Sequence, residues 1–233
     1  YMFAEVNVFD VGESKYGTRG FGSWNVSKVT TMKKMFSTKE GGLVTGALTE
    51  DLNNWDVSNV IDMSGMFERN GRYVNYYGGE FAFDKWDTSN VIDMSYMFYG
   101  VNVWSSVENW DVSNVQNMES MFEFENWSNG SDVYKGNFNQ NISGWDVSNV
   151  TNMKKMFKQQ QTNFNQDIRN WNVSKVQSMS EMFNFALKMN QDLSSWNVEN
   201  VIDCSGFAIH NTGGSVAEGN WTLPKPNFTN CNP

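Results

Sequence analysis

Residues 144–157 read GWDVSNVTNMKKMF, and this pattern decides the fold because it returns seven times along the 233-residue chain. The intervals between its tryptophans are 31, 31, 24, 35, 26, 25 and 25 residues for seven full copies and a degenerate eighth copy at Trp221. A shared unit of this length indicates stacked repeats whose variation comes from insertions. The seven full copies start at Trp24, Trp55, Trp86, Trp110, Trp145, Trp171 and Trp196.

Each copy contains two hydrophobic patterns when its tryptophan is numbered position zero. Apolar residues at −3, 0 and +2 flank a segment rich in aromatic and β-branched residues, which predicts a short strand. Positions +5, +8, +11 and +12, as in Val60, Met63, Met66 and Phe67, fall within an arc of about 120° at 100° per residue. We therefore predict an amphipathic helix there, with the serine at +3, Ser58 in this copy, as its N-cap.

A single unit buries too little apolar surface to offset the entropy lost on ordering about 25 residues. Parallel stacking would supply the missing burial and hydrogen bonds. We therefore predict one α/β fold, a β/α solenoid over residues 1–233 in which every unit has a short parallel strand and a short helix. We expect residues 1–20 to be the tail of a truncated upstream repeat, 21–209 to hold the seven repeats, and 210–233 to form a C-terminal cap.

The composition restricts the classes of partner. The formal net charge is −9 with a pI of about 4.6, which disfavours binding to nucleic acid or to anionic bilayers. No run of eighteen apolar residues occurs, so we expect no membrane insertion within this sequence. Hydrophobic residues make up 39% of the chain, which is enough for a continuous core.

The two cysteines could form one disulfide bond. Cys204 takes the place of a core methionine in the last full copy, and Cys231 is the third residue from the end. We predict a disulfide between them that pins the C-terminal segment onto the last repeat, as suits an oxidising, extracellular setting. The alternative is a buried thiol and a separate thiol in a frayed tail.

The motif WDVSNVTNMKKMF at 145–157, with NQDI at 165–168, closely resembles the bacterial surface protein repeat of Mycoplasma-type lipoproteins and Listeria surface proteins. That family is related to the BspA-like leucine-rich-repeat proteins. The resemblance covers essentially the whole chain, although the longer insertions here depart from regular spacing. It implies a leucine-rich-repeat-like solenoid at a cell surface, used for adhesion or recognition, without catalytic residues.

Aromatic residues in the insertions are the best candidates for ligand binding. They lie outside the core columns, among Gly, Asn and Ser residues, in segments that would leave the same edge of successive repeats. Such compositions are typical of adaptable binding loops. The alternative is that these side chains fold back over a neighbouring repeat. The residues concerned are Tyr73, Tyr76, Tyr77, Trp104, Trp127 and Tyr134.

The +1 column carries a row of carboxylates that stacking would bring close together. Calcium would relieve their repulsion, because carboxylate oxygens are its preferred ligands. The alternative is that each side chain accepts a hydrogen bond from a backbone N–H two or three residues on, and Asn replaces Asp freely in this column. The candidate calcium ligands are Asp56, Asp87, Asp111 and Asp146.

Asn126 and Asn129 begin Asn-x-Ser sequons in an insertion, and they are candidate glycan acceptors if the source uses a eukaryotic secretory pathway. Thirteen of the fourteen methionines fall at +8 or +11, on the apolar stripe. We therefore assign them to the core instead of to a soft-metal site.

The sequence offers little for catalysis. His210 is the only histidine, so no Ser/His/Asp or Cys/His machinery can be assembled. We expect no enzyme activity and no cofactor. The expected function is adhesion or recognition at an extracellular surface, with a protein or glycan of another surface as partner. The alternative is a structural subunit of an extracellular filament, surface layer or virion, which would contact identical chains.

Overall fold

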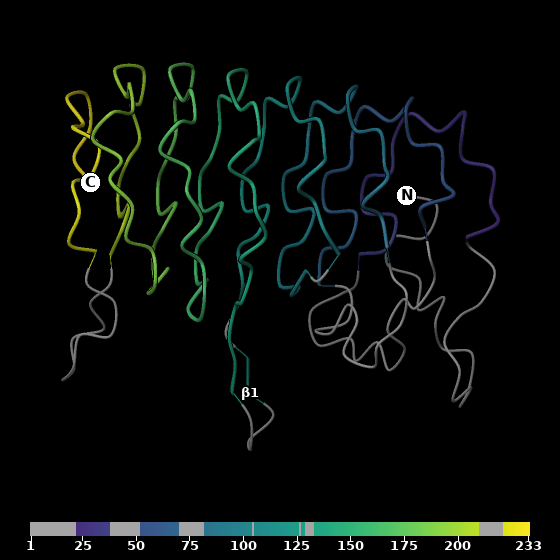
Figure 1. The fold of residues 1–233 in the computed structure, drawn as a ribbon, viewed down its shortest axis with the longest axis horizontal. Helices are drawn as coiled ribbons and strands as arrows, with labels where there is room; N and C mark the ends of the chain where they lie inside the picture. Colours follow the sequence, from purple (N-terminus) through teal and green to yellow (C-terminus); the bar gives the residue numbers. More distant parts are fainter. Residues whose placement is uncertain are drawn as a thin grey trace.

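The computed structural model describes residues 22–37, 52–69, 82–103, 105–125, 127–128, 133–209 and 221–233, with 127–128 and 133–134 described by their backbone. These segments form coils that stand side by side in one row (Figure 1). Each coil contains one copy of the motif, and we number the coils 1 to 7 in the order of their seven tryptophans.

The predicted α/β character is wrong. The described residues contain no helix, and their only strands are β1 (Trp127–Ser128) and β2 (Val133–Tyr134), which form an antiparallel pair. The coils are instead joined by single parallel bridges at position +7. The expected leucine-rich-repeat-like β/α solenoid is therefore replaced by a stack of irregular coils. The bridges run through Thr31, Asp62, Asp93, Asn117, Asn152, Ser178 and Asp203.

The backbone N–H groups that a helix would use are directed to the next coil. Met63 donates to the carbonyl of Asp93 at 2.9 Å, and Gly65 donates to that of Ser95 at 2.7 Å. This alternation continues at +12 and +14 and repeats from coil to coil. A helix would pair the same groups within one coil, and the stack would then lose this ladder of hydrogen bonds between coils.

Position +10 explains why no helix forms there. In each coil this residue has a positive φ, between 51° at Lys34 and 64° at Gly206. That left-handed conformation is incompatible with a right-handed helix. The N–H of +11 instead bonds the carbonyl of +8, as Met66 does to Met63 at 3.1 Å. A positive φ at the third residue of such a turn is what a type II turn requires.

Each coil is thus a succession of reverse turns. In coil 2, Trp55 N–H donates to Leu52 O at 3.0 Å, and Val60 N–H donates to Val57 O at 2.8 Å. Ser58 is consequently not an N-cap: its N–H and hydroxyl both donate to Asp56 Oδ1, at 3.2 and 2.6 Å. Apolar residues three apart point inward because a reverse turn, like one turn of a helix, brings residues three apart to the same side.

The predicted core positions are confirmed. Leu52, Trp55, Val57 and Val60 are at most 3% exposed, and the described methionines are all buried. Equivalent rings stack along the row: the Phe67 and Phe98 centroids lie 5.6 Å apart with their planes 7° from parallel. The core is therefore one continuous set of columns.

Two columns of side chains add hydrogen bonds between coils. From Trp86 on, the indole N–H of each motif tryptophan, Trp221 included, donates to a carbonyl of the preceding coil, as Trp145 does to Val107 at 3.0 Å. Asparagines at +4 do the same, for example Asn149 Nδ2 to Ser113 O at 2.7 Å. The indole bond is the second one to a carbonyl that already closes a turn, as Val107 O also accepts from Trp110 N–H at 3.2 Å, whereas the asparagine bonds reach carbonyls that the turns do not use.

Residues 221–233 lie against coil 7. Leu193 N–H donates to Pro224 O at 2.9 Å, and Phe228 packs edge-on against Phe207 with ring centroids 5.0 Å apart. None of the described segments forms a helix of the length and apolar character that crossing a membrane requires.

Candidate functional site

The β1–β2 hairpin is the main departure from the repeating coil among the described residues. Trp127 pairs with Tyr134 across the hairpin, and Ser128 pairs with Val133. The hairpin extends away from the row of coils at one edge (Figure 1). It therefore carries two of the predicted ligand-binding residues at opposed backbone positions.

The base of the hairpin is firmly anchored in the stack. Phe124, before it, is buried and its N–H donates to Lys158 O at 3.0 Å. Gly136, after it, packs so closely that an added Cβ would lie 2.6 Å from Gln159 O and 2.8 Å from Phe124 Cβ. Only glycine fits at this exit. The hairpin thus rises from a rigid platform, an arrangement that favours binding.

A cluster of aromatic and charged side chains lies at the same base. We define the tyrosine–arginine cluster as Arg69, Tyr96, Tyr99, Glu119 and Glu125. Arg69 Nη2 donates to Glu125 Oε1 at 2.9 Å, and the Arg69 guanidinium lies 5.1 Å from the Tyr99 ring centroid. Tyr99 also donates its hydroxyl to Glu125. Tyr96 donates to Glu119 Oε1 at 2.7 Å and meets the Tyr99 ring edge-on at 5.8 Å.

These contacts make both tyrosines harder to deprotonate. Burial, and then the hydrogen bond to Glu119, raise the pKa of Tyr96 to about 12. Burial and the hydrogen bond to Glu125 raise the pKa of Tyr99 as well. The two hydroxyls are therefore fixed hydrogen-bond donors at neutral pH, each aimed at a carboxylate.

A second ionic group adjoins this cluster along the row of coils. Glu123 is 8% exposed and accepts a hydrogen bond from Ser120 Oγ at 2.7 Å. Lys158 Nζ lies 3.9 Å from Glu123 Oε1 and also bonds Glu181. Burial raises the pKa of Glu123, while the Ser120 hydroxyl and Lys155 and Lys158 oppose that rise.

Sequence comparison identifies the repeats. A family model described as "Mycoplasma protein of unknown function, DUF285" matches residues 1–79, 73–135 and 126–212. The chain belongs to this family. A search of curated proteins found no match, and a search of solved structures found none either. The family match supports a Mycoplasma-type repeat, and it provides no support for a relationship to leucine-rich-repeat proteins.

The predicted ligand-binding residues of this DUF285 chain divide into two groups. The structure brings the backbones of Trp127 and Tyr134 together in the hairpin. The other four, with the sequon residues Asn126 and Asn129, lie outside the described residues. Those four are Tyr73, Tyr76, Tyr77 and Trp104.

The carboxylates of the +1 column have partners within their own turns. Asp56, Asp87, Asp111 and Asp146 each accept through Oδ1 from the N–H of the serine two residues on, at 2.9 to 3.2 Å. The Ser58 and Ser148 hydroxyls, and then these backbone N–H groups, lower the pKa of Asp56 and of Asp146. Among the described residues, no three His, Cys, Asp or Glu side chains are grouped so that they could hold a metal ion. The geometry matches the hydrogen-bonding alternative, and calcium binding stays a prediction.

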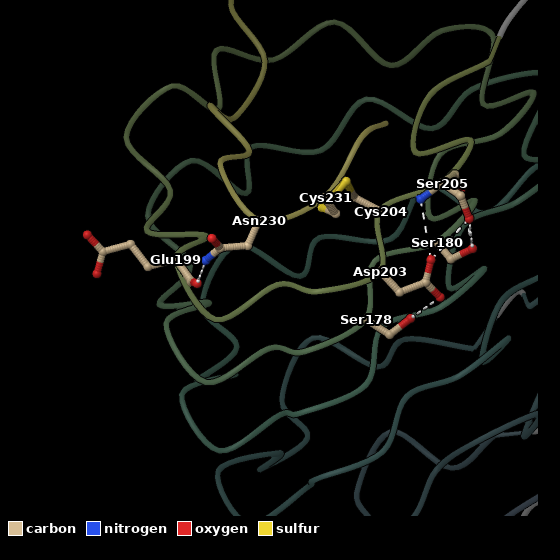
Figure 2. Close-up of a disulfide and its surroundings, with 8 residues drawn as sticks. All are labelled: Ser178, Ser180, Glu199, Asp203, Cys204, Ser205, Asn230 and Cys231. Carbon is tan, nitrogen blue, oxygen red and sulfur yellow. Dashed lines mark hydrogen bonds between the residues drawn. A yellow bond between two sulfur atoms is a disulfide. The ribbon is translucent and has the colours of Figure 1, made fainter.

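Cys204 and Cys231 form a disulfide, with their Cα atoms 5.8 Å apart (Figure 2). Next to it, Asp203 accepts hydrogen bonds from Ser178 Oγ at 3.2 Å and Ser205 N–H at 3.4 Å. Asn230 Nδ2 donates to Glu199 O at 2.6 Å. The C-terminal segment is therefore held to coil 7 by a covalent bond and by a hydrogen bond.

Sequence reasoning missed Tyr96 and Tyr99. They occupy +10 and +13 of coil 3, where other coils carry Lys, Gly, Ser, Glu, Asn or Ile. Two tyrosines at positions that hold no aromatic residue in the other coils are the signal that could have revealed them. Their carboxylate partners lie 23 and 26 residues further on, and only the alignment of neighbouring coils in the structure identifies them.

Proposed function

We propose that this chain is a non-catalytic recognition module that mediates adhesion at an extracellular surface. The observation that carries the proposal is the hairpin that pairs Trp127 with Tyr134 and rises from the anchored base beside Arg69, Tyr99 and Glu125. Aromatic residues next to arginine are the residue types that most often dominate binding energy. The rigid coils would limit the entropy lost when a partner binds.

The disulfide between Cys204 and Cys231 supports the extracellular location. Stable disulfides are rare in reducing compartments and common in secreted and surface-exposed proteins. The resemblance of the repeat to those of bacterial surface proteins agrees with this location. A protein or glycan on another surface is the partner that we propose.

The test compares the intact chain with a Trp127→Ala/Tyr134→Ala variant on a printed glycan array and on purified extracellular-matrix glycoproteins. We expect at least one binder whose affinity falls about tenfold or more in the variant. Lys188→Ala, which changes an exposed side chain elsewhere, is the matched control and should bind like the intact chain. Absence of any binder, or a binder that is indifferent to the double substitution, overturns the proposal.

Light scattering separates this function from a structural one. A recognition module should remain a monomer or a small oligomer. A subunit of a filament, surface layer or virion should assemble as its concentration rises.

A further inference from the structure

A groove runs along the row of coils on a surface separate from the hairpin. It has a volume of about 540 Å³ and spans coils 5, 6 and 7. Its walls come from positions +4 and +6, which flank the buried valine at +5. The lining residues are Thr151, Lys175, Gln177, Asn200 and Ile202.

Most of this lining is held in place before any ligand arrives. Asn200 Nδ2 donates to Ser174 O at 2.7 Å, and Thr151 Oγ1 donates to Gln116 O at 3.1 Å. Lys175 Nζ donates to Asn149 Oδ1 at 2.6 Å. Preorganised polar groups of this kind lose little entropy on binding.

The chemistry of the groove fits a neutral, hydroxyl-rich ligand. It presents amides, a hydroxyl and an ammonium group, and none of its five lining residues carries a carboxylate. Ile202 adds an aliphatic surface that is 71% exposed. A sugar ring matches this combination, because it has hydroxyls around its edge and apolar C–H groups on its faces.

The spacing of the coils selects among linear polymers. Paired parallel backbones lie about 4.8 Å apart, so equivalent groups in the groove recur at about that interval. An extended peptide repeats its side-chain face every two residues, or about 6.7 Å, and would drift out of register. A β-1,4-linked hexose chain advances by close to one coil spacing for each sugar.

We propose that this groove binds a linear, neutral β-1,4-linked glycan, with one sugar for each coil. The site is independent of the hairpin, so either proposal can fail without the other. The ligand lies along the row of coils and contacts Gln177 by hydrogen bonding and Ile202 by apolar packing.

The test titrates the full chain with cello-oligosaccharides and chito-oligosaccharides from the dimer to the hexamer, using calorimetry. Affinity should rise with length up to about three or four sugars, because the groove spans three coils. Gln177→Ala and Ile202→Ala should each weaken binding by about three- to tenfold. Leu223→Ala, an exposed aliphatic residue outside the groove, should leave binding unchanged.

One further ligand series and one further variant extend the test. Malto-oligosaccharides, which are α-linked and curved, should bind much more weakly than the β-linked series. The Trp127→Ala/Tyr134→Ala variant should bind the β-linked series as the intact chain does. No β-linked binding, equal binding of both series, or full affinity in the Gln177 and Ile202 variants each overturns the proposal.

Discussion

The indole N–H of Trp145 donates a 3.0 Å hydrogen bond to the carbonyl oxygen of Val107, 38 residues earlier in the chain. Trp145 is 4% exposed and Val107 is fully buried, so water has little access to this carbonyl, whose other donor is the Trp110 N–H at 3.2 Å. The same bond joins successive coils along the row. The tryptophan column thus combines ring packing with a hydrogen bond that phenylalanine cannot make.

Trp145→Phe should therefore lower the free energy of unfolding by about 1 to 3 kcal/mol, because it removes one of the two hydrogen bonds to the buried Val107 carbonyl and part of a packed ring. Urea unfolding followed by circular dichroism measures the change. Stability equal to that of the unaltered chain would contradict a role for the indole bond.

The asparagine column should contribute less, since it lies near the solvent. Asn149→Asp keeps the shape of the side chain but removes the donor to Ser113 O. We expect a loss of about 0.5 to 1.5 kcal/mol in the same unfolding assay. Lys188→Ala, at an exposed position that takes no part in the column, should change stability by less than about 0.5 kcal/mol.

Two glycines form a matched pair for testing the base of the hairpin. Gly136→Ala should destabilise the chain by about 1 to 3 kcal/mol, because the new methyl group would overlap Gln159 O and force the backbone to shift. Gly144→Ala should be nearly neutral, since nothing lies within 4 Å of its added Cβ. Thermal unfolding of the two variants gives the comparison, and equal melting temperatures would contradict the close packing at Gly136.

Glu123 should make stability depend on pH. Its folded pKa lies above its ordinary value of 4.5, chiefly through burial, so the folded chain holds this proton more tightly than the unfolded chain does. As pH rises from about 4.5 through the raised pKa, this residue's contribution to stability falls. Glu123→Gln should therefore gain stability relative to the unaltered chain over that window. Urea unfolding at a series of pH values tests this, and a difference that is constant with pH would contradict it.

Cleaving the disulfide should release the C-terminal segment from coil 7. Cys231→Ser removes a bond that closes 27 residues of chain and should cost about 3 to 4 kcal/mol. Hydrogen exchange should then increase around Phe207 and Phe228, whose rings meet at 5.0 Å. Intact-mass analysis of the unreduced chain should show no free thiol, and two free thiols would contradict the bond.

The sequence predicted the interior well and the backbone conformation poorly. Apolar spacings of three and four residues correctly identified Val60, Met63, Met66 and Phe67 as core residues. The same spacings were wrongly interpreted as a helix, because consecutive reverse turns also place residues three apart on one side. Only the positive φ at Gly65 and its equivalents distinguishes the two, and nonglycine residues occupy that position in five of the seven coils.

The candidate site was predictable in part. Trp127 and Tyr134 could be proposed from the composition of their insertion, and the structure pairs their backbones. The contact between Arg69 and Glu125 joins residues 56 positions apart. It depends on insertions of unequal length that bring +14 of coil 2 close to +15 of coil 4, and no local pattern encodes that alignment.

The sequence by itself determined which side chains are buried and how often the chain returns to the same column, because burial follows from the recurrence of apolar residues. The tertiary structure decided how the backbone travels between those positions. Each N–H can satisfy its hydrogen bond inside the coil or with the next coil, and that choice depends on where the neighbouring coil lies. With the neighbour in register, as for Gly65 and Ser95, the ladder forms and the helix does not.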